Sequence, residues 1–374
     1  MTVWDELVGQ QAAIEVLGAA ATDAAMATPG PAMTHAWLMT GPPGSGRSTA
    51  ARAFAAALMC PDGGCGQCAD CRSVLAGSHL DVEVIRPEGV TYKTADARAL
   101  VQRASMAPSR GTWHVLVLED ADRLTETANN VLLKAIEEPP PRAVWLLCTP
   151  SVEDVLPTIR SRCRHIMLKT PTPTDVADFL VEAESVDATT ALFAAQASQG
   201  HVGRARALAR DENARQRRRE ILSIPARLTD LRNCFSSAEA MVATAKEDAR
   251  AITEPLDARE KEDLLSAWGE GAEGRGVKGG ARGVKGAIKE LEVRQKSRTT
   301  RTERDQLDRA LLDLLGFYRD VLAHQFGATT DGSIAMINAE MRTEIVRVAD
   351  ASNTIETMWR IDAIERARLA LDAN

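Results

Sequence analysis

The sequence has no apolar run that approaches the length of a membrane span, and it has no excess of positive charge. Its opening residues, Met1 to Glu6, are unlike a signal peptide, so we expect a cytoplasmic protein with no membrane partner. The formal net charge of −7 argues against a protein that coats nucleic acid with its whole surface. The 374 residues, 45% of them hydrophobic, are enough for two or three domains with their own cores.

One glycine-rich segment, Gly41 to Ser48, lacks the lysine of a standard phosphate-binding loop. It reads G-x-x-x-x-G-R-S, and a strand expected over 35–40 and a helix expected over 48–59 flank it as the motif requires. Its glycines would let backbone N–H groups approach an anion at a helix N-terminus. Arginine is wider and more directional than lysine, so we expect ATP and Mg²⁺ to bind weakly or not at all, with little hydrolysis. The candidate nucleotide-binding residues in this segment are Gly41, Gly44, Gly46, Arg47 and Ser48. A glycine-rich turn without function is the alternative.

Two further strand ends carry polar residues of the same candidate site. The apolar stretch 113–118 runs into Glu119 and Asp120, the place where a nucleotide-hydrolysing protein holds Mg²⁺ and polarises water. The usual order is Asp-Glu, so the second acid is one methylene shorter here. Solvated acids at a strand end are the alternative. Thr149 follows the apolar stretch 143–148, where it would either sense a γ-phosphate or cap the turn.

Four cysteines lie within twelve residues, and this clustering favours a metal over disulfides in a reducing compartment. Thiolates at this spacing can converge on one Zn²⁺ at about 2.3 Å each. Four sulfur ligands leave no position for a catalytic water, so the expected site is structural. Four free buried cysteines or a redox pair are the alternatives. The candidate zinc ligands are Cys60, Cys65, Cys68 and Cys71.

Arginines crowd the segment 156–164, just before a strand expected at 166–168. An arginine at a subunit edge can complete a neighbour's phosphate site, where it raises the rate about 10³–10⁵-fold in known cases. Arg162 is the candidate, and an ordinary solvated charge is the alternative.

Together these segments resemble the bacterial AAA+ clamp-loader family. The opening Trp4 to Gln10 is similar to the family's F/W-x-x-h-V-G-Q segment, and the four-cysteine insert looks like its zinc module. The segment 130–140 resembles its N-x-L-L-K-x-h-E-E-P-P motif, and 156–163 resembles its L-P-T-I-x-S-R-C motif. These motifs cover roughly the first 170 residues.

The resemblance implies a non-motor subunit that supports ATP-dependent loading of a sliding clamp onto primed DNA. Its partners would be the gamma/tau and delta subunits of DNA polymerase III, with the clamp and DNA reached through the complex. Arg162 would act in trans on a motor subunit, and the zinc would be structural. A gamma/tau-type motor is the alternative, although Arg47 and the order Glu119-Asp120 argue against it. A zinc-dependent DNA-binding regulator is a third candidate, which the charge balance does not support.

The resemblance also implies the domain plan, an α/β AAA+ core followed by a helical lid and an all-α collar. We expect the core with its four-cysteine module at 1–170, the lid at 171–219 and the collar at 220–374. Within the collar, a flexible, basic, glycine-rich insertion is expected at about 269–301; it would either contact DNA phosphates by charge or serve only as a solubilising loop. Arg215 and 217–219 are expected on a solvated helix face. Arg204 lies near the lid position of a second phosphate-sensing arginine, but one residue late, and we assign it no role.

Overall fold

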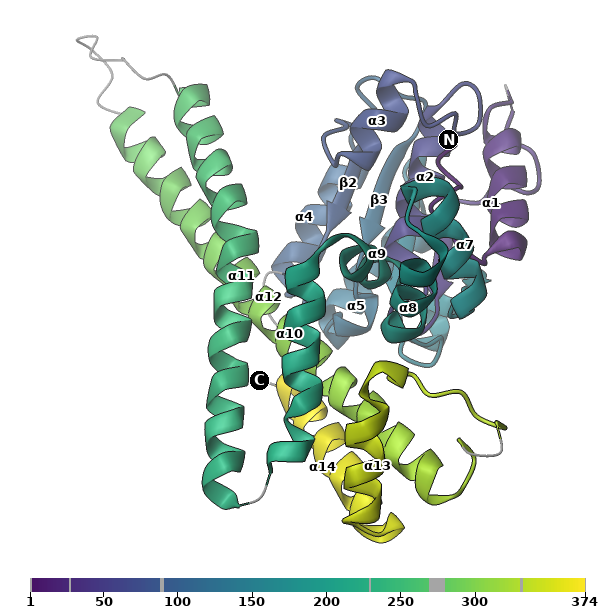
Figure 1. Cartoon of the computed structure of the whole chain (residues 1–374). Helices are drawn as coiled ribbons and strands as arrows, with labels where there is room; N and C mark the ends of the chain where they lie inside the picture. Colours follow the sequence, from purple (N-terminus) through teal and green to yellow (C-terminus); the bar gives the residue numbers. More distant parts are fainter. Residues whose placement is uncertain are drawn as a thin grey trace. The chain divides into compact units, whose positions relative to one another are not determined.

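The structure is a computed structural model that describes residues 2–26, 28–87, 91–228, 230–268, 280–329 and 332–373. It divides into two compact units, Met1–Glu212 and Asn213–Asn374, which can be followed by colour in Figure 1. Within the described part of the chain, none of the helices combines the length and the apolar content that a membrane crossing requires.

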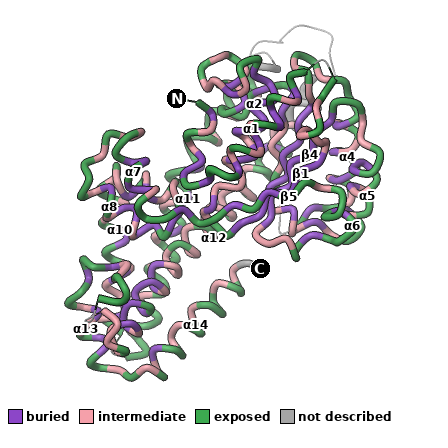
Figure 2. The backbone as a smooth tube through the Cα atoms, turned by 90° about the vertical axis from the view of Figure 1, so that its right-hand side faces the viewer, coloured by how far each residue is buried: buried purple, intermediate pink, exposed green. Residues whose placement is uncertain are grey.

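The first unit is built on a five-stranded sheet in which all neighbouring strands are parallel. The strand order is β2-β3-β4-β1-β5. The strands are β1 (Ala36–Thr40), β2 (Val82–Ile85), β3 (His114–Leu118), β4 (Ala143–Thr149) and β5 (Arg164–Met167). Figure 2 shows the central strands β1 and β4 as buried, as expected for a parallel sheet covered on both faces. The α/β core expected from the sequence is therefore confirmed.

Helices cover both faces of this sheet because successive strand residues point to opposite sides. Trp37 and Met39 pack into one core with the helices α1 and α2, whereas Leu38 packs into a second core on the other face with α4 and α5. The helices of this region are α1 (Gln11–Ala24), α2 (Arg47–Met59), α3 (Ala69–Leu75), α4 (Thr94–Ala104), α5 (Glu126–Glu137) and α6 (Pro157–Arg160), with a 3-10 turn η1 at Ala121–Arg123. Figure 1 shows the sheet between these layers.

Three short helices complete the first unit, namely α7 (Pro173–Glu184), α8 (Ala188–Ser198) and α9 (Val202–Arg210). Thr172 caps α7 in a capping box with Asp175, which explains why the chain turns into a helix directly after the proline-containing linker. Buried alanines line α8, so α8 can lie close to its neighbours. The helical region expected after residue 170 is present, and its role as a lid stays a prediction.

The second unit consists of helices and short turns in its described residues. Its core gathers apolar side chains from α10, α12 and α13, with Phe317 and Ile345 fully buried. The elements are α10 (Glu212–Ser223), η2 (Pro225–Arg227), α11 (Leu231–Trp268), α12 (Gly280–Gln325), η3 (Ala339–Met341), α13 (Arg342–Asp350) and α14 (Thr354–Ala373). Its last two helices are α13 and α14.

The expectation of a flexible insertion over 269–301 is wrong for residues 280–301, which belong to the helix α12. Residues 269–279 lie outside the described residues. The basic residues of α12 did not prevent a helix because α11 supplies acids beside them. Arg298 forms ion pairs with Asp257 and Glu260, and Leu291 is buried in the same helix pair.

The solvated face expected around 215–219 is wrong at Arg218, which is only 4% exposed. Its guanidinium donates to Asp313 at 3.1 Å and also to Asn338 and Glu340. Asp313 is itself 5% exposed, so this is a buried ion pair. Local sequence could not reveal it, because the partners lie far along the chain.

Replacing Arg218 by alanine should lower the free energy of unfolding of the second unit by about 3–5 kcal/mol, because Asp313 would remain buried without its cation. Chemical denaturation followed by circular dichroism measures this. Arg219→Ala, at an exposed position on the same helix, is the control and should change stability by about 0.5 kcal/mol at most. An Arg218 variant as stable as the Arg219 variant would contradict the prediction.

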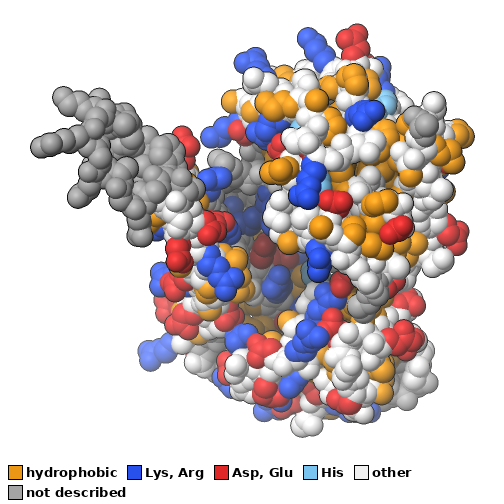
Figure 3. Space-filling view, turned by 90° about the horizontal axis from the view of Figure 1, so that it is seen from above, with side chains coloured by type: hydrophobic (Ala, Val, Ile, Leu, Met, Phe, Trp, Pro, Cys, Tyr) orange, Lys and Arg blue, Asp and Glu red, His pale blue; other side chains and the backbone are white. Residues whose placement is uncertain are grey.

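The surface carries charges of both signs. On the face shown in Figure 3, lysine and arginine side chains stand among acidic and hydrophobic ones.

Candidate functional site

The glycine loop connects β1, a central strand of the sheet, to the first turn of α2. Gly44 and Gly46 have φ angles of +87° and +89°, a region that favours glycine. Gly46 is the N-cap of α2, and no side chain caps this helix end. The loop therefore has the backbone of an anion-binding turn at a helix N-terminus.

Arg47 begins α2, and its guanidinium donates a hydrogen bond back to the carbonyl oxygen of Gly41. Its positive charge is thus held against the loop's own backbone. A lysine in this position normally extends to the β- and γ-phosphates. Ser48, the next residue, helps to lower the pKa of the Glu119 carboxyl.

Glu119, at the end of β3, is 5% exposed and is bound by two arginines. Arg52 of α2 contacts one carboxylate oxygen at 3.0 Å, and Arg86, which follows β2, donates to both oxygens. Burial by itself raises the pKa of the Glu119 carboxyl, but the hydrogen bond and charge of Arg86 and the charge of Arg52 lower it. The carboxylate is therefore ionised and already neutralised by side chains of this chain.

Asp120 and Thr149 stand near Glu119 at the ends of neighbouring strands. Asp120 has a left-handed backbone, with φ of 52°, at the start of η1. Thr149 is fully buried, and its hydroxyl donates to the carbonyl of Ser151 at 3.3 Å. This bond ties Thr149 to the turn after β4; a role in phosphate sensing stays a prediction.

Residues from both ends of the first unit hold the glycine loop. Gln10 donates to the carbonyl oxygens of Ser45 at 3.3 Å and Lys169 at 2.6 Å. A Cβ added to Gly44 would stand 3.1 Å from the Cβ of His201, so His201 lies directly against the loop. The histidine also accepts a hydrogen bond from the backbone N–H of Arg204 at the start of α9. The loop is therefore packed against the helical part of this unit.

The four candidate zinc ligands converge. Their Sγ atoms all lie within 4.8 Å of one another, and within the described residues they form a group that could hold a metal ion. Backbone N–H groups of Cys65, Cys68 and Cys71 point at the sulfurs of the preceding ligands at 3.3–3.4 Å, which favours thiolates. With four sulfurs and no histidine or carboxylate in the group, the donor set fits a closed zinc site.

The thiols differ in how easily they ionise. Burial opposes ionisation of Cys60, but N–H groups of its own turn lower the pKa of this thiol to about 7. Burial and the neighbouring sulfurs raise the pKa of Cys71. A divalent cation would offset the repulsion among the thiolates. The opening segment packs on this module, with Val3 N–H bonded to Gly64 O at 3.0 Å.

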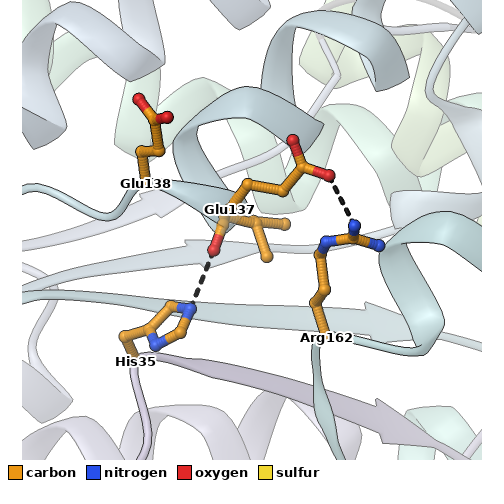
Figure 4. A pocket seen from close by; sticks show the side chains of 5 residues that line it. His35, Glu137, Glu138 and Arg162 are labelled. Carbon is orange, nitrogen blue, oxygen red and sulfur yellow. Dashed lines mark hydrogen bonds and ion pairs between the residues drawn. The ribbon is translucent and has the colours of Figure 1, made fainter.

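Arg162 lies just after α6, beside a shallow pocket that Figure 4 shows. Its guanidinium forms an ion pair with Glu137 at 2.6 Å and donates to Thr158 O at 2.7 Å. It precedes the amino end of β5, which runs parallel to β1, whereas the glycine loop follows the carboxyl end of β1. Arg162 therefore lies at the amino ends of the parallel strands, whereas the glycine loop lies at their carboxyl ends. Arg164, in contrast, bonds Ala32 O and lies over Trp37.

Similar proteins match this arrangement over the first unit. The family model described as "DNA polymerase III, delta subunit" matches residues 24–172. This region is similar to subunits of bacterial DNA polymerase III. DNA polymerase III subunit delta' of Bacillus subtilis (strain 168) is 31% identical over 155 residues, 41% of this chain and 47% of that protein. DNA polymerase III subunit gamma/tau of Mycobacterium tuberculosis (strain ATCC 25618 / H37Rv) is 35% identical over 138 residues, 36% of this chain and 24% of that protein.

The chain thus spans less than half the length of these curated relatives. Among solved structures, the Thermotoga maritima RuvB Holliday junction branch migration motor is 19% identical, covering 67% of this chain and 78% of that chain, with a TM-score of 0.41.

Three groups in the first unit were not anticipated from sequence. Arg52 and Arg86 bind Glu119, His201 covers Gly44, and Glu137 pairs with Arg162. The position of Arg52 near the candidate site could have been predicted from the sequence, because Arg52 lies one helical turn after Ser48 on the same helix face. The others depend on how separate elements pack.

Proposed function

We propose that this chain is a non-motor, delta-prime-type subunit of the DNA polymerase III clamp loader. In this role it supports ATP-dependent loading of a sliding clamp onto primed DNA without hydrolysing ATP itself. Its direct partners are the gamma/tau and delta subunits, and it reaches the clamp and DNA through the complex. The observation that carries the proposal is the ion-pair cluster in which Arg52 and Arg86 bind Glu119.

This cluster supports a lost motor function because a catalytic Mg²⁺ needs a free acid at the end of β3. Two arginines beside Glu119 repel a divalent cation and occupy the oxygens that would help to hold it. Arg47 adds a third cation near the loop and is itself bonded to Gly41. ATP could at most bind weakly, and hydrolysis would lack its metal.

The position of Arg162 supports action in trans. Because Arg162 lies at the amino ends of the strands and the glycine loop lies at their carboxyl ends, Arg162 cannot contact a nucleotide bound in the loop of its own chain. An arginine on an exposed edge can be offered to a nucleotide held by an adjacent motor subunit. The zinc module would then be a rigid structural part of the subunit.

A gamma/tau-type motor is the second candidate. It is favoured by the 35% identity to a gamma/tau subunit and by the retained glycines of the loop. It requires that Mg²⁺ and ATP displace Arg52, Arg86 and Arg47 from their present partners.

ATP hydrolysis by the purified chain separates the two candidates. We expect the ATP turnover of the unmodified chain to be at least about 10²-fold below the roughly 10 s⁻¹ typical of enzymes. The Arg47→Lys variant should have the same low turnover, because Glu119 stays bound by Arg52 and Arg86. Phosphate release in Mg²⁺ measures the rate. The matched control is the same lysine variant with Arg52 and Arg86 changed to alanine. Fast, Mg²⁺-dependent hydrolysis by the unmodified chain would support the motor instead.

A further inference from the structure

The pair formed by Arg162 and Glu137 joins the ends of two elements of the first unit. The Arg162 Nη2 atom is 2.6 Å from the Glu137 carboxylate, and Nη1 donates to Thr158 O at 2.7 Å. Figure 4 shows both side chains pointing toward each other across the pocket. The guanidinium is thus already engaged within its own chain.

Both sides of this pair are held by the surrounding structure. Glu137 is the last residue of α5, and His35, just before β1, bonds the carbonyl of Ile136 at 2.8 Å. Prolines follow directly after Glu138, so the helix cannot continue. The carboxylate of Glu137 is therefore presented at a fixed place next to Arg162.

The pair is weak enough to open. Both side chains are 39% exposed. Ion pairs at such exposure contribute about 0.2–1 kcal/mol and are screened by salt. A phosphate group carries more charge than a carboxylate and can accept two parallel hydrogen bonds from one guanidinium, so it is the stronger partner.

We propose that Glu137 is a positioning residue that holds Arg162 in the free chain and competes with a neighbouring subunit's phosphate for it. The inference rests on the trans role of Arg162 proposed above. While the ion pair between Arg162 and Glu137 is formed, Arg162 is not available to the neighbouring subunit. The rate of ATP hydrolysis by that subunit therefore falls in proportion to the fraction of time for which the pair is formed. Assembly exchanges one anionic partner of the same guanidinium for another.

The first test uses the isolated full-length chain and needs no ATP hydrolysis. Glu137→Gln should shift the ¹H–¹⁵N side-chain NMR signals of Arg162, assigned by comparison with Arg162→Lys. Glu138→Gln is the matched control, because Glu138 lines the same pocket and points away from Arg162 in Figure 4. Equal, small shifts in both variants would overturn the inference, whatever the role of Arg162.

The second test uses ATP hydrolysis by the assembled complex with gamma/tau and delta subunits. At low ionic strength Glu137→Gln should raise the rate about 1.5- to 5-fold, the equivalent of an exposed ion pair. The gain should shrink toward none as salt rises, and it should vanish when Arg162 is alanine. Glu138→Gln should leave the rate unchanged. A structural defect would lower the rate at every salt concentration.

The two proposals fail differently. If Arg162→Ala leaves the rate of the complex unchanged, the trans role is wrong and the inference falls with it. If Arg162→Ala slows the complex but Glu137→Gln slows it too or leaves it unchanged, the trans role stands and only the holding role of Glu137 is overturned.

Discussion

ATP hydrolysis by the assembled clamp-loader complex should slow by about 10³-fold when Arg162 of this chain is replaced by alanine. In the proposed role, the guanidinium stabilises charge that develops on the transferred phosphoryl group, and the low dielectric of a closed interface strengthens that interaction. Arg162 lies at the amino ends of the strands, away from the chain's own glycine loop. It can therefore act only on a nucleotide that an adjacent subunit binds.

The measurement is steady-state phosphate release by the complex, with size-exclusion chromatography to check assembly. Arg160→Ala is a matched control, because Arg160 is an exposed arginine two positions away on the adjacent short helix. It should leave the rate within about twofold, a change of less than 0.5 kcal/mol in the barrier. Arg162→Lys should recover only part of the rate, since lysine cannot form two parallel bonds. If the complex assembles with the Arg162→Ala variant and hydrolyses ATP at the normal rate, Arg162 does not act in trans.

Cys65→Ser should release the metal and lower the free energy of unfolding of the first unit by about 4 kcal/mol or more. The reason is that Cys60 and Cys71 are part of the core that also holds Val74 and Phe54, so a lost cation leaves sulfurs facing one another inside a packed region. Structural zinc contributes its binding free energy to folding, because the unfolded chain has no preformed site.

Elemental analysis and thermal unfolding test this together. The unmodified chain should carry about one zinc per chain, and a strong chelator should reproduce the loss of stability caused by Cys65→Ser. Cys234→Ser is the control, because Cys234 is exposed and lies outside the cluster. A chain that purifies without metal and unfolds at the same temperature with or without Cys65 contradicts a structural zinc site.

Much of the first unit follows from local sequence. The strand before the glycine loop, the helix after it and the strand before Glu119 all lie within a residue or two of their expected places. Apolar runs bounded by glycine, proline and acids mark buried parallel strands, and these signals are local. The convergence of the four cysteines was also predictable, since their spacing leaves little room for them to separate.

The second unit was predicted less well. Charge and glycine content indicated a flexible segment where α12 begins, but the acids of α11 lie beside its basic residues and stabilise a helix pair. Arg218 was assigned to solvent because its helix is rich in arginine, yet Asp313 and Asn338 surround it. Composition describes a segment alone and contains nothing about the element that packs against it.

In the first unit, the sequence by itself determined which elements form and which residues stand at their ends: the glycine loop, Glu119 and Asp120, the cysteine module and Arg162. Only the tertiary structure decided what each charged residue contacts. Glu119 contacts Arg52 and Arg86, and Arg162 contacts Glu137, because the parallel strands and their helices bring residues that are distant in sequence close together. Local structure depends on neighbours along the chain, whereas ion pairing depends on distance in space.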